Sequence, residues 1–302
     1  MSKSIVRHVA TFVAAPGGSL GTDIALQALA KAGVSPSRVD WLDPGVALDV
    51  FFDAAGEQLQ TLRAGVESAL GAESIDVVVQ PAAKRRKMLL VSDMDATMIA
   101  QECLDELART VGLGDAVAEL TSKAMRGEMD FEEALTTRVA LFEGVSTEAI
   151  DGLVESLTPN PGAGTLVATM RAYGAHTALV SGGFTLFASP VGARLRFHGV
   201  FANELEIAEG RLTGHITPPI RGKKAKGDIL TGLRDKLGLA AEATLAVGDG
   251  ANDLDMLAVA GLGVAWRAKP QVAAAAQARL NHADFTALLF AQGFARREFV
   301  EN

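Results

Sequence analysis

The sequence predicts a two-domain α/β protein, in which a small α+β unit precedes a larger domain built on a parallel sheet. Its 302 residues favour two domains over one. Residues 1–80 contain strands and helices of their own, and a polar, basic segment at 81–87 follows them. In residues 88–302, short apolar runs alternate with helical stretches, which is typical of a doubly wound parallel sheet.

The N-terminal unit follows the order β-α-β-β-α-β. Strands are predicted near 5–14, 37–42, 46–52 and 75–79 and helices at 23–31 and about 57–70, with a turn at Asp43–Pro44–Gly45. This order fits a ferredoxin-like sandwich. Residues 81–87 contain a proline and four basic residues, so we expect a solvated linker rather than a nucleic-acid patch.

Composition narrows the class of protein. The chain carries 36 acidic and 28 basic residues, and its net charge of −8 argues against an extended nucleic-acid surface and against anionic membranes. No apolar run reaches the roughly 18 residues of a transmembrane helix, and the N-terminus continues into domain-like sequence, so we expect a cytoplasmic protein. The single cysteine, Cys103, lies in a helical pattern, where a packing role is expected.

A pair of carboxylates follows the first strand of the larger domain. The apolar run that begins at Met88 is predicted to be a buried strand, and Asp93 and Asp95 come directly after it. Open α/β sheets place their ligand crevices at this end of their strands. Two carboxylates this close repel each other unless a cation lies between them or one of them holds a proton.

A second acidic cluster changes the interpretation of the first. Residues 248–253 (GDGAND) follow the predicted strand at 244–247. If the two strands are neighbours, Asp93, Asp249 and, as a further candidate, Asp253 converge with a backbone carbonyl around one hard cation. Mg²⁺ prefers such oxygen ligands and keeps positions open for water and a phosphate oxygen. The alternative is that these aspartates are only turn and cap residues.

Two further segments could bind a phosphate. Ser181–Gly182–Gly183 follows the predicted strand at 176–180, and its hydroxyl and backbone N–H groups suit an anion, although such a triplet is more often only a turn. Lys223, Lys224 and Lys226 precede a predicted helix. One of them could balance the charge of the aspartates, and spacing leaves open which one.

The segment between the first two strands of the larger domain is predicted to be helical. Helices are expected near 100–112, 114–126, 130–143 and 147–157, which makes residues 100–160 a helical insertion. Further along the chain, a hairpin is expected near 200–216, with its turn at Glu209–Gly210.

These motifs, in this order, resemble the haloacid dehalogenase superfamily of phosphatases. The motifs are D-x-D-x-T at 93–97, S-G-G at 181–183, a lysine, and G-D-G-x-N-D at 248–253, and the finer match, over about 88–290, is to the phosphoserine phosphatase family. The resemblance implies a Rossmann-like core with a helical cap. Ala96 stands where this family usually carries Ser or Gly. The N-terminal unit resembles an ACT-like module, which implies a ligand sensor or a dimerisation surface, unless it is a mere appendage.

The resemblance also implies roles for individual residues. Asp93 would be the nucleophile that forms an aspartyl-phosphate, and Asp95 the general acid and then the general base. Mg²⁺ would be held by Asp93, the main-chain carbonyl of Asp95, and Asp249. Of the three lysines, the match selects Lys226. The implied phosphate-binding residues are Ser181, Gly182 and Lys226, with Asn252 nearby.

The cap would select the substrate in this family. Arg138 would bind a carboxylate with its fork of donors, and Glu102 would pair with an α-ammonium, so that the substrate is O-phospho-L-serine. Met125 and Phe131 would be apolar cap residues over the site, with core packing as an equal alternative. Without the resemblance, Arg138 would be an exposed helix arginine and Glu102 a first-turn glutamate.

Three functions follow from this resemblance. The expected one is Mg²⁺-dependent hydrolysis of phosphoserine, the last step of serine synthesis. The alternatives are phosphotransfer from phosphoserine to an alcohol such as homoserine, and a non-catalytic amino-acid sensor. The expected partner is a small molecule, with no nucleic acid and no membrane, and a homodimer is one expectation for an oligomeric state that the sequence leaves open.

Overall fold

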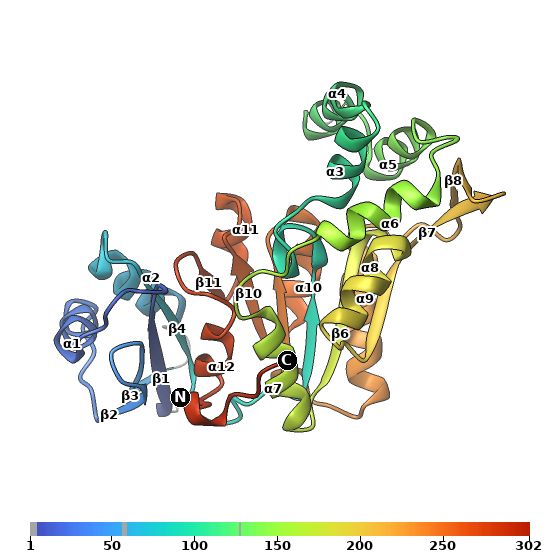
Figure 1. Cartoon of the computed structure of the whole chain (residues 1–302). Helices are drawn as coiled ribbons and strands as arrows, with labels where there is room; N and C mark the ends of the chain where they lie inside the picture. The colour runs from blue at the N-terminus through green and yellow to red at the C-terminus, as the bar shows by residue number, and fades with distance from the viewer. Residues whose placement is uncertain (1–4, 56–58, 127) are drawn as a thin grey trace.

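The computed structural model describes residues 5–55, 59–126 and 128–302, and it contains two sheets, one in each predicted domain (Figure 1). The first is antiparallel and belongs to the N-terminal unit. The second is mostly parallel and carries a helical cap. The predicted fold, a parallel α/β core with a helical insertion behind a small α+β domain, is confirmed.

The N-terminal domain has the predicted β-α-β-β-α-β order. Its elements are β1 (Ile5–Ala14), α1 (Thr22–Lys31), β2 (Arg38–Asp43), β3 (Ala47–Ala55), α2 (Leu59–Leu70) and β4 (Ile75–Pro81). The strand order is β2-β3-β1-β4, with every pair antiparallel. The β2–β3 turn needs Gly45, whose φ of +75° a side chain would oppose. The start of the second predicted helix, at 57–58, lies outside the described residues.

The larger sheet has the strand order β11-β10-β9-β5-β6-β7-β8. Its strands are β5 (Leu89–Ser92), β6 (His176–Phe184), β7 (Gly199–Ala208), β8 (Arg211–Thr217), β9 (Thr244–Gly248), β10 (Leu262–Trp266) and β11 (Ala278–Leu280). All pairs are parallel except β7–β8. The chain builds outward from β5 in one direction and returns to add β9 on its other side. The boundary between β5 and β9 is therefore the topological switch point, where such sheets bind ligands.

Helices cover both faces of this sheet. One layer contains α7 (Ala163–Ala172), α8 (Thr185–Arg194) and α12 (Ala287–Ala291), and the other contains α9 (Lys223–Lys236), α10 (Leu254–Val259) and α11 (Pro270–Ala275). Strand β5 serves both layers, since Leu90 packs into the first and Leu89 and Val91 into the second. This double burial explains why β5 is apolar at successive positions.

The cap contains α3 (Cys103–Thr110), α4 (Gly114–Met125), α5 (Phe131–Ala140) and α6 (Thr147–Ser156). It leaves the core through a tight turn, Met94–Met98, and returns beside it, where Ile99 forms a bridge with Pro159. The predicted β7–β8 hairpin reaches up to the cap (Figure 1), where Gly144 N–H donates to the carbonyl of Leu212 at 2.8 Å. Arg194 of α8 also donates to the carbonyls of Val154 and Leu157, so the cap contacts the core at the turn, at the hairpin and along α6.

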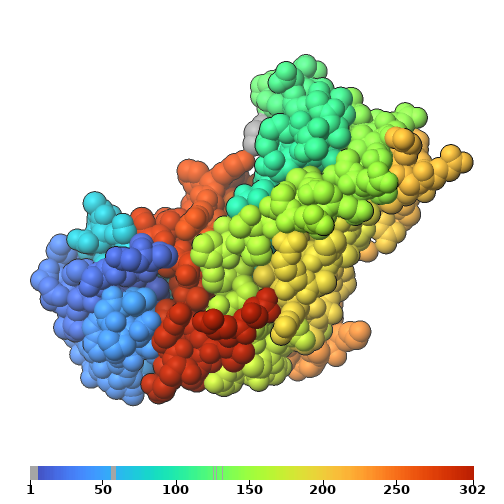
Figure 2. All heavy atoms as spheres, in the orientation of Figure 1, coloured from blue at the N-terminus to red at the C-terminus, as the bar shows by residue number. Residues whose placement is uncertain are grey.

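The two domains pack against each other closely. Val13, Ala47 and Val78, on the sheet face opposite α1 and α2, belong to the same apolar cluster as α12. In the space-filling view the C-terminal residues fill the space between the N-terminal domain and the rest of the core (Figure 2). None of the described helices is long and apolar enough to cross a membrane.

The connecting segment at 81–87 is only partly the solvated linker that the sequence predicts, since four of its seven residues are exposed and Lys87 is buried. Each of its basic side chains has a partner: Lys84 Nζ lies 3.0 Å from Glu242, Arg85 2.7 Å from Asp49, Arg86 2.7 Å from Glu298, and Lys87 Nζ donates to the Glu242 carbonyl at 2.7 Å. Lys87 is only 6% exposed. The sequence carries no signal for these contacts because the partners lie far away in the chain.

The buried Lys87 should make stability depend on pH. Burial lowers its pKa to about 8 in the folded protein, from 10.5 in the unfolded chain. Between these values the unfolded chain binds more protons, so the free energy of unfolding should rise with pH, by up to about 3 kcal/mol. Urea unfolding from pH 7 to 10.5 should show this rise in the wild type and in Lys84→Met. An equal rise in Lys87→Met would contradict the assignment.

Candidate active site

The two acidic motifs and the Ser181–Gly182–Gly183 motif lie at the carboxyl edge of the larger sheet. Asp93 follows β5 and Asp249 follows β9, and these two strands are adjacent and parallel. The backbone N–H of Asp93 donates to the carbonyl of Val247 at 3.0 Å, which holds the two strand ends together. Ser181 and Gly182 lie near the end of β6, on the other side of β5. The topology therefore brings the separate sequence motifs to one place.

A buried lysine lies between two buried carboxylates. Lys226 Nζ is 2.6 Å from Asp93 Oδ1 and 2.7 Å from Asp253 Oδ1, and all three residues are at most 5% exposed. Burial alone would lower the pKa of Lys226, but the charges of Asp93 and Asp253 outweigh it and raise that pKa. Lys226 is therefore a permanent cation within the cluster.

The other two lysines of this segment lie on the surface. Lys223 Nζ is 3.7 Å from Asp255, and Lys224 Nζ is 2.7 Å from Asp228, with both pairs exposed to solvent. All three lysines belong to the start of α9, so the direction of each side chain from the helix decides which one is buried.

Three carboxylates of the cluster could hold a cation. Oxygen atoms of Asp93, Asp249 and Asp253 lie within 4.8 Å of one another. Burial and the charge of Asp253 raise the pKa of Asp93 well above its usual range, despite the opposing effect of Lys226. Burial and Asp253 also raise the pKa of Asp249. One lysine does not balance three carboxylates, so the donor set fits a hard divalent cation such as Mg²⁺.

The three carboxylates differ in how they are held. One carboxylate oxygen of Asp253 accepts a hydrogen bond from Lys226, and the other accepts the Gly250 N–H at 3.0 Å. Asp249 accepts the hydroxyl of Thr97 at 3.0 Å. Asp93 and Asp249 are consequently the more available ligands, and Asp253 mainly positions Lys226. A contribution from the main-chain carbonyl of Asp95 stays a prediction.

Asp95 lies in a different environment from Asp93. Its Oδ1 accepts the backbone N–H of Cys103 at 2.9 Å, and its Oδ2 accepts the hydroxyl of Ser181 at 3.1 Å. Asp95 is partly exposed, whereas Asp93 is 5% exposed. Between Asp95 and Thr97 the chain turns through Ala96, whose φ of +50° is the left-handed conformation that disfavours a side chain. Glycine would adopt this conformation with less strain, because it lacks a Cβ.

The carboxyl end of β6, which carries Ser181 and Gly182, is supported by a residue that sequence analysis missed. The side-chain amide of Asn203 donates to the carbonyl of Gly182 at 2.9 Å, and its oxygen accepts the Arg221 N–H at 2.6 Å. Asn203 is 1% exposed. A single asparagine within a predicted hairpin carries no local signal of this kind. Asn252 is half-buried in the turn Ala251–Asp253.

Two charged cap residues share one electrostatic environment. Glu102 immediately precedes α3 and is exposed, yet partial desolvation and repulsion from Asp95 and Asp249 raise its pKa to about 7. Arg138, in the last turn of α5, is half-buried, and burial lowers its pKa against the opposing charges of Asp105 and Glu102. The side chains of Met125 and Phe131 lie outside the described part of the chain.

Cys103 has the packing role that the sequence predicts. Its side chain is 3% exposed and belongs to the large apolar cluster. Burial and the nearby charge of Asp95 raise the pKa of its thiol, which makes it a poor nucleophile. Its backbone N–H, by contrast, contributes directly to the site through Asp95.

The chain belongs to the haloacid dehalogenase-like hydrolase family, whose profile matches residues 90–258. The fold agrees: a HAD-family hydrolase, t0658, from Salmonella enterica subsp. enterica serovar Typhi superposes with a TM-score of 0.83 at 30% identity, over 94% of this chain and 98% of that one.

Several similar proteins are phosphoserine phosphatases. The one from Streptomyces coelicolor is 35% identical over 97% of this chain and 72% of its own length, and SerB2 of Mycobacterium tuberculosis is 40% identical over 78% and 58%. Two solved phosphoserine phosphatases, one described as substrate-bound and one as a phospho-aspartyl intermediate analogue, each have a TM-score of 0.63 at 34% identity, over 68% of this chain and 98% of theirs.

Removing the buried cation should destabilise the fold. Lys226→Met leaves Asp93 and Asp253 buried without their counter-charge, so the free energy of unfolding at pH 7 in EDTA should fall by about 3–5 kcal/mol. Lys224→Met is the matched control on the same helix, and since its ion pair is exposed it should change the value by less than about 1 kcal/mol. Urea unfolding measures both, and equal losses would contradict the role of Lys226.

Proposed function

We propose that the protein hydrolyses O-phospho-L-serine to L-serine and phosphate with Mg²⁺ as its cofactor. The observation that carries this proposal is the cluster of Asp93, Asp249 and Lys226 at the switch point, beneath a cap that presents Glu102 and Arg138. The cluster suits a phosphoryl group, and the two cap residues suit the charges of an amino acid. The names of the relatives support the same substrate.

In the first half-reaction Asp93 is the nucleophile. A carboxylate oxygen of Asp93 attacks phosphorus, and the bond between phosphorus and the serine oxygen breaks, which forms an aspartyl-phosphate. Asp95 gives its proton to the departing serine oxygen. The hydrogen bonds from Cys103 N–H and Ser181 hydroxyl fix the orientation of Asp95 for this transfer.

In the second half-reaction the roles of Asp95 reverse. As a carboxylate it takes a proton from water, whose oxygen attacks phosphorus, and Asp93 leaves as a carboxylate. Lys226, with Ser181 and Gly182, binds the phosphoryl oxygens, while Asn252 lies at the edge of the site. Asp93, Asp249 and the Asp95 carbonyl would hold Mg²⁺, which when bound neutralises charge on the phosphoryl group.

Two further expectations remain proposals. A cytoplasmic location fits an enzyme of serine synthesis and the absence of a disulfide requirement, since the chain has one cysteine. A homodimer would double the chain mass of 31.4 kDa, which light scattering coupled to size-exclusion chromatography can measure.

The purified protein should release phosphate from phosphoserine with MgCl₂ and lose this activity in EDTA. Asp93→Asn should lower kcat by about 10³-fold or more, because an amide is a poor nucleophile, while the melting transition persists. Asp228→Asn, an exposed change on α9, is the control. Substantial turnover by Asp93→Asn would rule out the nucleophilic role of Asp93.

A screen over phosphoserine, phosphothreonine and small sugar phosphates tests the substrate. Running it with and without homoserine distinguishes hydrolysis from phosphotransfer.

Arg138→Ala should damage phosphoserine hydrolysis selectively. Loss of a charge-assisted hydrogen bond to the substrate carboxylate should lower kcat/KM for phosphoserine by about 10- to 100-fold, and for p-nitrophenyl phosphate, which has no such carboxylate, by less than about threefold. Arg109→Ala, an exposed arginine of α3, should leave both unchanged. Equal losses on both substrates would show that Arg138 does not bind the carboxylate.

A further inference from the structure

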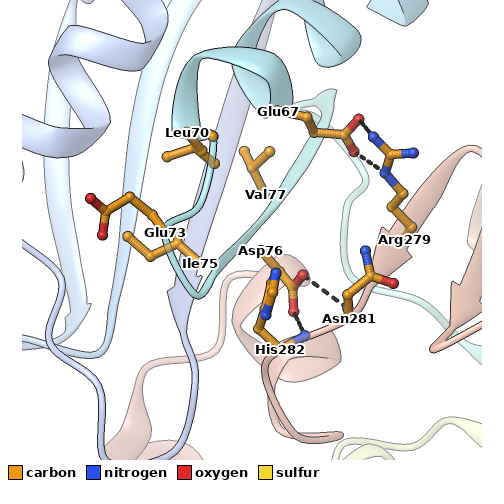
Figure 3. Close-up of a pocket in the computed structure, with 10 residues that line it drawn as sticks. Glu67, Leu70, Glu73, Ile75, Asp76, Val77, Arg279, Asn281 and His282 are labelled. Atoms are coloured by element: carbon orange, nitrogen blue, oxygen red, sulfur yellow. Dashed lines mark hydrogen bonds and ion pairs between the residues drawn. The ribbon is translucent and has the colours of Figure 1, made fainter.

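The N-terminal domain holds a loop of the core through one buried carboxylate. Asp76, on β4, is 5% exposed and accepts three backbone N–H groups, from Asn281 and His282 at 2.9 Å each and from Ala283 at 2.8 Å. Figure 3 shows Asp76 directed at this loop, beneath the ion pair of Glu67 with Arg279 and beside a cavity of about 140 Å³. The loop's conformation therefore depends on the N-terminal domain.

This loop, residues 281–286 between β11 and α12, also contacts the chain segments that join the cap to the core. We call these segments, residues 97–100 and 158–162, the cap stem. The backbone N–H of Phe285 donates to the carbonyl of Pro161 at 3.0 Å. Gly162 has a φ of +79°, and a Cβ there would come within 2.8 Å of the Thr286 nitrogen. Such close packing transmits displacements of the loop to the stem.

The cap stem in turn contacts a predicted magnesium ligand. The side chain of Asn160 donates to the carbonyl of Thr97 at 2.6 Å, and its backbone N–H donates to Met98 at 2.9 Å. The hydroxyl of Thr97 donates to Asp249 at 3.0 Å. A continuous series of hydrogen bonds and packed backbone thus runs from Asp76 to the candidate active site.

We infer that Asp76 is a positioning residue of the active site, contributed by the N-terminal domain. By holding residues 281–283 it keeps the cap stem in place, and through Asn160 and Thr97 it keeps Asp249 in position to bind Mg²⁺. The N-terminal domain is then part of the active-site scaffold. An effect of Asp76 on phosphoserine hydrolysis rests on the proposed function. Its effects on the cap stem and on Mg²⁺ binding do not.

The chemistry of Asp76 makes the inference testable. The carboxylate of Asp76 accepts all three N–H groups. In Asp76→Asn the side-chain NH₂ group, itself a donor, replaces one of the two accepting oxygens. In Asp76→Ala the three N–H groups lose their acceptor. Asp49→Asn is a matched control. Asp49 is also a fully buried carboxylate at the domain junction, and it contacts Thr11 and Arg85 rather than the loop.

Two measurements on the 302-residue chain without substrate test whether Asp76 positions the cap stem and the Mg²⁺ site. Hydrogen exchange should become at least about tenfold faster at the amides of Asn160 and Phe285 in both Asp76 variants. Titration calorimetry with MgCl₂ should show binding about three- to tenfold weaker. Each protein is measured at the same number of degrees below its own melting temperature. Under these conditions Asp49→Asn should keep wild-type exchange rates and wild-type Mg²⁺ affinity.

A double-mutant cycle separates positioning from a general loss of stability. If Asp76 acts through the stem, Asn160→Ala should weaken Mg²⁺ binding, and adding Asp76→Asn should weaken it no further. In the double variant Asp49→Asn/Asn160→Ala, the change in Mg²⁺-binding free energy should equal the sum of the two single changes. With phosphoserine, the Asp76 variants should raise the MgCl₂ concentration for half-maximal rate by the factor that calorimetry measures.

The outcomes distinguish this inference from the proposed function. If Asp76 variants lose stability but keep wild-type exchange at Asn160 and wild-type Mg²⁺ affinity, Asp76 only fastens the domains together and the inference is wrong. If exchange and Mg²⁺ affinity change as expected while no variant, the wild type included, hydrolyses phosphoserine, the proposed substrate fails and the positioning role stands. Asp76→Asn carries the comparison if Asp76→Ala does not fold.

Discussion

The ion triplet of Lys226 with Asp93 and Asp253 is the interaction on which the candidate active site depends. Three charged groups are removed from water at the end of β5, which is costly unless they compensate one another. Lys226 permits two carboxylates to lie side by side, and the nearby Asp249 leaves the cluster with excess negative charge. This excess negative charge suits the cluster to the divalent cation that we propose it binds.

The two aspartates of the first motif differ because their surroundings differ. Asp93 is buried beside a lysine, and Asp95 is partly exposed and held by a backbone N–H and a hydroxyl. In the mechanism that we propose, these distinct environments would let Asp93 act as the nucleophile while Asp95 exchanges a proton. The difference comes from their partners, since Lys226 contacts Asp93, and Cys103 and Ser181 contact Asp95.

The N-terminal domain and the connecting segment are built into the core rather than appended to it. Lys87 is buried, Arg85 pairs with the buried Asp49, and Asp76 binds three successive backbone N–H groups. Each contact joins residues far apart in the chain. Together they give the N-terminal domain a structural role near the cap stem that does not require it to bind a ligand.

The sequence by itself determined the order of elements and the chemistry at the sheet edge. Apolar runs mark strands that are buried on both faces, and the motifs at 93–97, 181–183 and 248–253 stand at strand ends because parallel strands deliver their loops to one edge. The proposed substrate-binding residues, Glu102 and Arg138, could likewise be named from the sequence, through its resemblance to a known family. Asp43–Pro44–Gly45 likewise predicts its turn, since glycine tolerates a positive φ.

Only the tertiary structure decided which groups meet. Three lysines within four positions are equivalent in sequence, and the orientation of α9 buries Lys226 while Lys223 and Lys224 stay at the surface. Asn203, Asn160 and Asp76 form hydrogen bonds with partners that lie between 18 and 207 positions away. Local patterns report the propensity of a segment and the periodicity of its burial. Long-range hydrogen bonds depend on how the chain closes on itself, which no local pattern records.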